Sequence, residues 1–193
     1  MFYVFIIIAY LLGSISPSII LGRLAGVDIK KEGSGNAGTT NTLRVLGKKA
    51  ALITLVIDIC KGIAAVLLGK LAASPCAYIC ALAVFAGHIW PVFFKFKGGK
   101  GVATAFGAIL AVNWKVGLIS LAVAVILTLI TRRMSVGSIC AALGMVVMTI
   151  IFEKAFLPFG AVIALIIIIK HRANINRLVK GEEPPVSFKK SKS

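Results

Sequence analysis

Three short segments of this chain combine glycine, amide and basic residues in patterns that suit an anion. The first, Gly33–Arg44, places Gly33, Gly35 and Gly38 close together and follows them with hydroxyl and amide side chains. Glycine lets consecutive backbone N–H groups turn toward one point, which forms an anion-binding nest. Arg44 adds a planar guanidinium that fits phosphate or carboxylate. The segment predicts an anion-binding loop, with a flexible polar loop as the alternative.

The glycine spacing of Gly33–Gly38 also matches the fingerprint of dinucleotide-binding proteins, and Asp58 follows at a suitable distance. The rest of the pattern excludes that interpretation. No strand pattern precedes the glycines, and Asp58 lies inside an apolar run rather than at the end of a second strand. A nucleotide-binding P-loop is excluded as well, because no lysine follows Gly38.

The second segment surrounds Lys100 with Gly98, Gly99 and Gly101, directly before an apolar run that begins at Val102. Helix N-termini and unpaired backbone amides attract anions, and Lys100 adds a full positive charge. The alternative is a positively charged membrane anchor with a glycine hinge. His88, which precedes this segment, can equally be a hydrogen-bonded histidine within a helix.

Two further segments are weaker candidates. Ser135 and Ser138 follow a pair of arginines and can extend an anion site, or the arginines can serve only as topology signals. Near the C-terminus His171 and Asn174 are three residues apart, so on a helix they share a face. The alternative there is a basic amphipathic helix on anionic lipid headgroups.

The composition indicates which elements position these segments. The chain has 193 residues, of which 59% are hydrophobic, and a mean hydropathy of +1.01. A soluble domain is only about 45–50% apolar, so we expect an all-α membrane protein with seven transmembrane helices. The apolar runs are Phe2–Leu21, Ala50–Leu68, Cys76–Phe94, Val102–Val112, Val116–Thr131, Val136–Phe152 and Ala155–Ile169.

Val102–Val112 is too short to cross a bilayer alone, and omitting it gives six spans. With seven spans, most basic residues lie on one side, in the connections 22–49, 95–101 and 132–135 and in the tail from Lys170. With six they divide between both sides. The positive-inside rule therefore favours seven, with the N-terminus outside and the C-terminus in the cytoplasm.

We expect a single domain over 1–193, with 182–193 as a loosely ordered tail. The net charge of +16 follows the membrane topology and lacks interleaved aromatic residues, so nucleic acid is not an expected partner. The four cysteines lie in apolar runs without metal-ligand spacing, and we expect no metal and no cofactor. Asp58 and Lys61, three apart inside the second span, can pair with each other or act directly.

These observations favour two glycine-rich anion sites at the inner face of a membrane. An enzyme that joins a soluble phosphate compound to a lipid fits this arrangement, and so does a transporter of phosphate or another anion. A non-catalytic binder of lipid headgroups would need the basic residues but not the glycines. Short outer connections and the lack of repeats count against the transporter.

Three motifs resemble one family, the bacterial acyl-phosphate:glycerol-3-phosphate acyltransferases (PlsY). They are Gly33–Arg44, Gly87–Pro91 running into Lys97–Thr104, and Lys170–Arg177. The resemblance implies a multi-pass enzyme of the bacterial cytoplasmic membrane with its active site on the cytoplasmic side. It would transfer a fatty acyl group from acyl phosphate to the 1-hydroxyl of glycerol 3-phosphate, giving lysophosphatidic acid and inorganic phosphate. This is the first acylation of phospholipid synthesis, and a soluble enzyme that makes acyl phosphate would be a partner.

The resemblance also implies roles for residues of this chain. Ser34, Arg44, Lys100, His171 and Asn174 would line a polar pocket for the substrate phosphates. The wider set of expected substrate-binding residues is Gly33, Gly35, Asn36, Thr39, Asn41, Gly98, Gly99, Gly101, Ser135 and Ser138.

The residue chemistry agrees with an activated acyl donor. The sequence shows no catalytic triad pattern, and neither His88 nor His171 is followed by the His-x4-Asp pattern of acyltransferases that use thioesters, because positions 93 and 176 hold Phe93 and Asn176. Acyl phosphate is already a mixed anhydride, so positioning and charge stabilisation suffice. The hydroxyl proton goes either to His171 or to a substrate phosphate oxygen.

Overall fold

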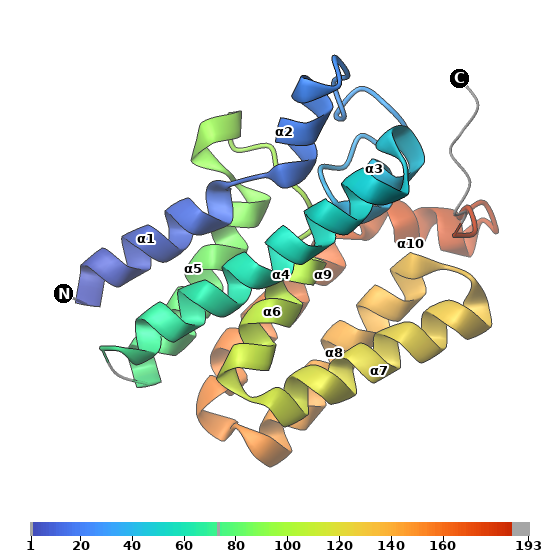
Figure 1. Ribbon diagram of the computed structural model, residues 1–193. Coiled ribbons are helices and arrows are strands. Elements are labelled where there is room, and N and C mark those ends of the chain that lie inside the picture. Colours follow the sequence, from blue (N-terminus) through green and yellow to red (C-terminus); the bar gives the residue numbers. More distant parts are fainter. Residues whose placement is uncertain (1, 73, 187–193) are drawn as a thin grey trace. The chain divides into compact units, whose positions relative to one another are not determined.

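The computed structural model describes residues 2–72 and 74–186, and within these ranges the chain is helical or loop without any strand (Figure 1). The all-α prediction is therefore confirmed. The elements are α1 (Phe2–Ser14), α2 (Pro17–Leu24), α3 (Thr39–Leu46), α4 (Lys48–Lys70), α5 (Ser74–Ile89), η1 (Val92–Phe94), α6 (Val102–Val112), α7 (Trp114–Thr131), α8 (Met134–Phe152), η2 (Lys154–Phe156), α9 (Leu157–Lys170) and α10 (Arg172–Val179).

The helices form two compact units. The first contains the chain up to Ala108, and the second contains residues 109–186, so the division falls within α6. Each unit has its own packed interior. The single domain expected over 1–193 stays a prediction beside this division.

Five segments among the described residues are long and apolar enough to cross a membrane, and the bent pair Lys154–Lys170 and Arg172–Val179 makes a sixth if it counts as one span. The five are Phe2–Leu24, Lys48–Lys70, Pro75–Phe94, Trp114–Thr131 and Met134–Phe152. Large apolar side chains such as Leu52, Leu129 and Ile130 are exposed along them, as expected for lipid-facing residues. Val102–Val112 remains a short apolar helix of 11 residues. The count of seven spans and their orientation stay predictions.

In the first unit α1, α4 and α5 lie side by side (Figure 1). Glycines allow this close approach, because a Cβ atom on Gly13 would overlap the backbone of Val84, and one on Gly87 would overlap the backbone of Tyr10. Small residues at crossings are typical of membrane helices, where close packing replaces the hydrophobic effect. The result is a rigid frame that positions the polar segments at its ends.

The first span is broken. Helix α1 ends at Ser14, and α2 begins at Pro17 after two non-helical residues. Proline has no N–H group, and its ring clashes with the preceding turn, so a helix through this point loses backbone hydrogen bonds. Carbonyl groups near the break therefore need other donors.

In the second unit α8 packs against both α7 and α9. Asn113 fixes the turn before α7, because its Oδ1 accepts from the amides of Lys115 (3.1 Å) and Val116 (3.4 Å). Its Nδ2 donates to the carbonyl of Phe152 (3.1 Å) and to Glu153 Oε2 (3.0 Å). The start of α7 is thus tied to the end of α8.

Candidate active site

The first glycine loop is shaped by one buried amide. Gly33 and Gly35 have φ angles of 60° and 67°, which side-chain-bearing residues adopt only with strain. Asn41 Nδ2 donates to the carbonyls of Ile29 (3.0 Å) and Glu32 (3.0 Å), and Asn41 Oδ1 accepts from the Ser34 amide (2.8 Å). Both donors of Asn41 are used by the backbone. Asn41 therefore holds the loop in shape, while the side chain of Ser34 is exposed.

Helix α3 begins directly after this loop, with Gly38 as its extended N-cap residue. The first amides of a helix have no intrahelical acceptor, so they favour an anion at that end. The hydroxyl oxygen of Thr39 is buried there and has no hydrogen-bond partner among the described residues. Arg44, one turn further along, is half-buried and pairs with no carboxylate in the described part of the chain.

The second glycine loop folds back on the end of α5. The amide of Gly98 donates to the carbonyl of Ile89 (3.1 Å), and that of Gly99 donates to the carbonyl of His88 (3.2 Å). Gly101 has a φ angle of 81° and leads into α6. These contacts fix the backbone on both sides of Lys100, which is half-buried.

The two glycine loops touch. A Cβ atom built on Gly99 would lie 2.5 Å from the carbonyl oxygen of Ala37 and would also overlap His88 Nε2. Only a residue without a side chain can therefore sit between the first loop and the imidazole. This contact brings the segment of Ser34 and the segment of Lys100 together, while their role as anion sites stays a prediction.

Positive charge dominates the polar end of the first unit. Burial lowers the pKa of Lys30, Asp28 opposes this effect, and the nearby charges of Lys97 and Arg23 lower the pKa further. Crowded cations of this kind favour binding of an anion.

In the second unit His171 is buried at the junction of α9 and α10. Its Nδ1 lies 2.8 Å from the carbonyl oxygen of Ile167. A carbonyl only accepts, so Nδ1 carries the hydrogen, and in the neutral ring Nε2 has the lone pair. The imidazole is thereby oriented with Nε2 as its proton acceptor.

Glu183 is the centre of a second polar group, which we term the Glu183 cluster. Its Oε1 accepts from Ser135 Oγ (2.8 Å) and Asn174 Nδ2 (2.6 Å), and its Oε2 accepts from Arg177 Nε (2.8 Å). Arg133 also donates to the backbone carbonyl of Glu183. Burial raises the pKa of Glu183, but the hydrogen bonds from Asn174, Ser135 and Arg177 outweigh it and lower the pKa below the usual value. The carboxylate is therefore ionised at neutral pH.

This cluster lies at the start of the segment that the sequence predicts to be a loosely ordered tail, which stays a prediction for the segment as a whole. The tail from Glu182 was expected to be loosely ordered, yet Glu183 is only 5% exposed and is bonded from three directions. Residues 187–193 lie outside the described residues. Sequence reasoning missed Glu183 because it stands in a polar, proline-containing segment. Ser135, Asn174 and Arg177 meet around Glu183 only in the folded chain, so the sequence carried no signal for this role.

The predicted site residues thus fall into two groups, one within each unit. The first group consists of the two glycine loops with Ser34, Asn36, Thr39, Asn41, Arg44 and Lys100. The second consists of Ser135, Ser138, His171 and Asn174. Within it Ser135 and Asn174 share Glu183, whereas Ser138 Oγ donates to the carbonyl of Met134 (2.9 Å) in its own helix.

Comparison with known proteins identifies the family to which this chain belongs. The model of the family described as glycerol-3-phosphate acyltransferase matches residues 3–181. The chain belongs to this family. It is 44% identical to a glycerol-3-phosphate acyltransferase of Clostridioides difficile (strain 630), over 95% of both chains. A protein of the same description from Shewanella loihica (strain ATCC BAA-1088 / PV-4) is 45% identical, over 96% of this chain and 93% of the relative.

Two solved structures of PlsY, an integral membrane glycerol 3-phosphate acyltransferase, share the fold of this family member. The glycerol 3-phosphate form has a TM-score of 0.93 and 39% identity, over 96% of each chain. The lysophosphatidic acid form has a TM-score of 0.89 and 38% identity, over 97% of this chain and 96% of the other. The protein is therefore an acyltransferase and an integral membrane protein with several apolar helices.

Proposed function

We propose that the protein transfers a fatty acyl group from acyl phosphate to the 1-hydroxyl of glycerol 3-phosphate, giving lysophosphatidic acid and inorganic phosphate. The observation that carries this proposal is the contact of Gly99 with Ala37. It joins two anion-binding loops, one leading to Arg44 and the other holding Lys100. A reaction between two phosphate-bearing substrates needs such adjoining sites.

The reaction needs no covalent enzyme intermediate. The 1-hydroxyl oxygen attacks the acyl carbonyl carbon and forms the ester C–O bond. The C–O bond to phosphate breaks, and phosphate leaves with the bonding electrons and, finally, with the hydroxyl proton. The protein contributes orientation, and it stabilises charge on the carbonyl oxygen and the leaving phosphate. Arg44, Lys100, Ser34 and the loop amides are proposed for this role.

The proton of the attacking hydroxyl has two acceptors to choose from. His171 Nε2 carries the lone pair and can accept it. We favour a phosphate oxygen of the substrate, with His171 as a substrate-binding residue. Asn174, Ser135 and Ser138 are proposed to support this site through their own hydrogen bonds rather than to bind substrate directly.

The enzyme is further proposed to cross the bacterial cytoplasmic membrane seven times, with Val102–Val112 as the fourth crossing and the glycine loops in the cytoplasm. The support is the distribution of basic residues along the chain. In this orientation the loops face soluble glycerol 3-phosphate, and acyl phosphate comes from a soluble enzyme. The acyl chain and the product enter the membrane lipid.

The test measures phosphate release by purified protein in detergent, given acyl phosphate with and without glycerol 3-phosphate. Release that requires glycerol 3-phosphate, with an equal amount of lysophosphatidic acid, is the expected result. Folded protein that releases no phosphate from acyl phosphate would contradict the proposed donor. Uptake of phosphate into sealed vesicles would then support a transporter instead.

Arg44→Lys tests the proposed fork-like grip on phosphate. Lysine keeps the charge but loses the two parallel hydrogen bonds, so we expect KM for glycerol 3-phosphate to rise about tenfold or more. Steady-state kinetics measure this change. Arg23→Lys is the matched control, because its guanidinium lies over the Phe94 ring. An unchanged KM in Arg44→Lys would remove Arg44 from the site.

His171→Ala separates the two routes for the proton. If a phosphate oxygen accepts the proton, the variant should bind substrate more weakly but keep turnover at saturating substrate. Measurement of kcat and KM for both substrates decides between them. Complete loss of kcat would identify His171 as the base.

A further inference from the structure

Four polar side chains that the proposed mechanism does not use meet in the interior of the first unit. Asp58, Lys61, His88 and Thr104, which we term the charge cluster, are 1%, 6%, 5% and 0% exposed. Ionised groups within membrane helices are costly and are retained when they have a task. The contacts of the cluster indicate that task.

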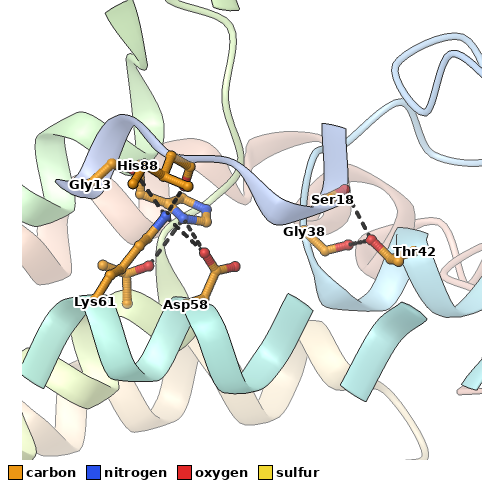
Figure 2. Close-up of polar contacts among 9 residues, drawn as sticks. Gly13, Ser18, Gly38, Thr42, Asp58, Lys61 and His88 are labelled. Carbon is orange, nitrogen blue, oxygen red and sulfur yellow. Dashed lines mark hydrogen bonds and ion pairs between the residues drawn. The ribbon is translucent and has the colours of Figure 1, made fainter. Parts of the chain in front are cut away.

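Lys61 satisfies the break in the first span. Its Nζ donates to the carbonyls of Gly13 (2.9 Å) and Ile15 (2.7 Å), which flank the point where α1 ends. The ammonium also forms an ion pair with Asp58 Oδ1 (2.8 Å). Lys61 therefore joins two backbone carbonyls at the break to the carboxylate of Asp58. Figure 2 shows Lys61 and Asp58 on α4 reaching across to the segment of Gly13 and to His88.

The opposite end of the cluster reaches the second glycine loop. His88 Nδ1 lies 3.3 Å from Asp58 Oδ1 and 3.0 Å from Thr104 Oγ1. Both contacts are made by Nδ1 and fix that edge of the imidazole, while Nε2 lies against the position where Gly99 lacks a side chain. The carbonyl of His88 also accepts the Gly99 amide (3.2 Å). A turn of the imidazole would displace the backbone next to Lys100.

The broken span links the same cluster to the first glycine loop. Beyond the break, Ser18 Oγ of α2 lies 2.9 Å from Thr42 Oγ1 of α3, and Thr42 Oγ1 lies 3.1 Å from the carbonyl of Gly38 (Figure 2). The position of α2 therefore bears on the start of α3, where the first loop ends. Lys61 fixes the chain just before α2.

We propose that the charge cluster is a positioning device that holds both glycine loops in register for binding phosphate. Asp58 is its hub, because it joins the ammonium that supports the broken span to the imidazole that supports the second loop. None of the four residues touches substrate. The proposal rests on the proposed function only in naming the substrate, glycerol 3-phosphate.

Thr104 allows the cleanest test. Thr104→Val removes the hydroxyl contact to His88 and keeps the shape, whereas Thr104→Ser keeps the hydroxyl. Binding of glycerol 3-phosphate to the purified full chain is measured by calorimetry, together with kcat and both KM values. We expect Thr104→Val to weaken binding about fivefold, with kcat little changed, and Thr104→Ser to bind as the wild type does. Unchanged binding in Thr104→Val, or a loss of kcat alone, would overturn the proposal.

The ion pair is tested by a double variant. Lys61→Met leaves the Asp58 carboxylate buried without its cation, so this variant should be strongly destabilised. Asp58→Asn combined with Lys61→Met removes both charges and should recover much of the thermal stability. If the cluster positions the loops, the double variant still binds glycerol 3-phosphate at least about fivefold more weakly than the wild type. Wild-type affinity in the double variant would show that the pair serves folding alone.

The same measurements separate the two proposals. Wild-type protein that binds glycerol 3-phosphate but does not use acyl phosphate would contradict the proposed donor, and the binding comparison would still decide the role of the cluster. Wild-type protein that does not bind glycerol 3-phosphate would overturn both proposals.

Discussion

The glycine loops of the first unit and the Glu183 cluster of the second treat polar groups in opposite ways. The loops are built mainly from backbone, with Asn41 as their internal bracket, and the nearby Arg44 has no carboxylate partner in the described chain. The Glu183 cluster surrounds its own carboxylate with side-chain donors. Arg44 beside the loops pairs with no carboxylate among the described residues, whereas the Glu183 cluster already holds an internal anion.

This difference predicts which residues bind substrate and which support the site, and residue type alone does not. Ser34 and Ser135 are both serines in predicted anion-binding segments. The hydroxyl of Ser34 is exposed on a loop, whereas that of Ser135 is buried and bonded to Glu183. A hydroxyl group with an internal partner must give up that bond before it can bind substrate, which costs about as much as it gains.

The contact between the loops gives the prediction with the largest effect. Gly99→Ala would place a methyl group against the Ala37 carbonyl, which is backbone, and against the His88 ring, whose Nδ1 is held by Asp58 and Thr104. The two loops must then separate, and we expect activity to fall about a hundredfold. Gly144→Ala is the matched control, because its Cβ would meet nothing closer than 3.9 Å. Both are measured by initial rates, with thermal stability alongside.

Equal activity in Gly99→Ala and Gly144→Ala would contradict the role given to the loops, since it would mean that their contact does not matter for the site. Loss of activity in Gly99→Ala with an unchanged melting temperature would support that role. The defect would then lie in the site and not in the fold.

Glu183→Gln should act mainly on stability. The change removes the charge that three donors surround, and a hydrogen bond to a charged group contributes about 1.5–3 kcal/mol. We expect the melting temperature in detergent to fall by several degrees. Glu182→Gln, at the exposed neighbouring position, should leave it unchanged.

The pH dependence of the same pair gives a further check. The pKa of Glu183 is lowered in the folded protein, so its contribution to stability is present above the ordinary carboxyl value of 4.5 and is lost as the pH falls through the lowered value. The difference in melting temperature between wild type and Glu183→Gln should therefore shrink below pH 4.5. A difference that stays constant down to acid pH would contradict an ionised Glu183.

Much of the fold could be predicted from the sequence, because membrane helices are set by local composition. Apolar runs and the positions of glycine and proline located the helices and the two loops. Val102–Val112 shows the limit of prediction from composition. This helix has 11 residues, fewer than a span needs, so the sequence alone does not decide whether it crosses the membrane. The break before Pro17 was also missed, because the run Phe2–Leu21 is apolar enough on average to be taken as one span, although Gly13, Ser14 and Pro17 mark the point where the helix stops.

The shape of the glycine loops could be predicted where the motif itself requires a particular backbone conformation. Gly33, Gly35 and Gly101 adopt the positive φ angles for which glycine is suited. The role of Asn41 was not predictable, because its acceptors are carbonyls that the loop brings to it only after folding. The pairing of Asp58 with Lys61 followed from their spacing, but the contact with His88 is tertiary and has no signal in sequence.

Substitution of Ser138 should have the smallest effect on stability and serves as the control for substitution of Ser135. Its hydroxyl donates to the Met134 carbonyl within α8 (2.9 Å), as helical serines often do. Ser138→Ala should therefore change the free energy of unfolding by less than about 0.5 kcal/mol and leave both KM values unchanged. Ser135→Ala, three residues earlier, should destabilise the protein clearly, because a buried donor to Glu183 is lost. A KM that rises in Ser138→Ala would show that this hydroxyl leaves its helix to bind substrate, and the rule that bonded side chains support while open ones bind would fail at that position.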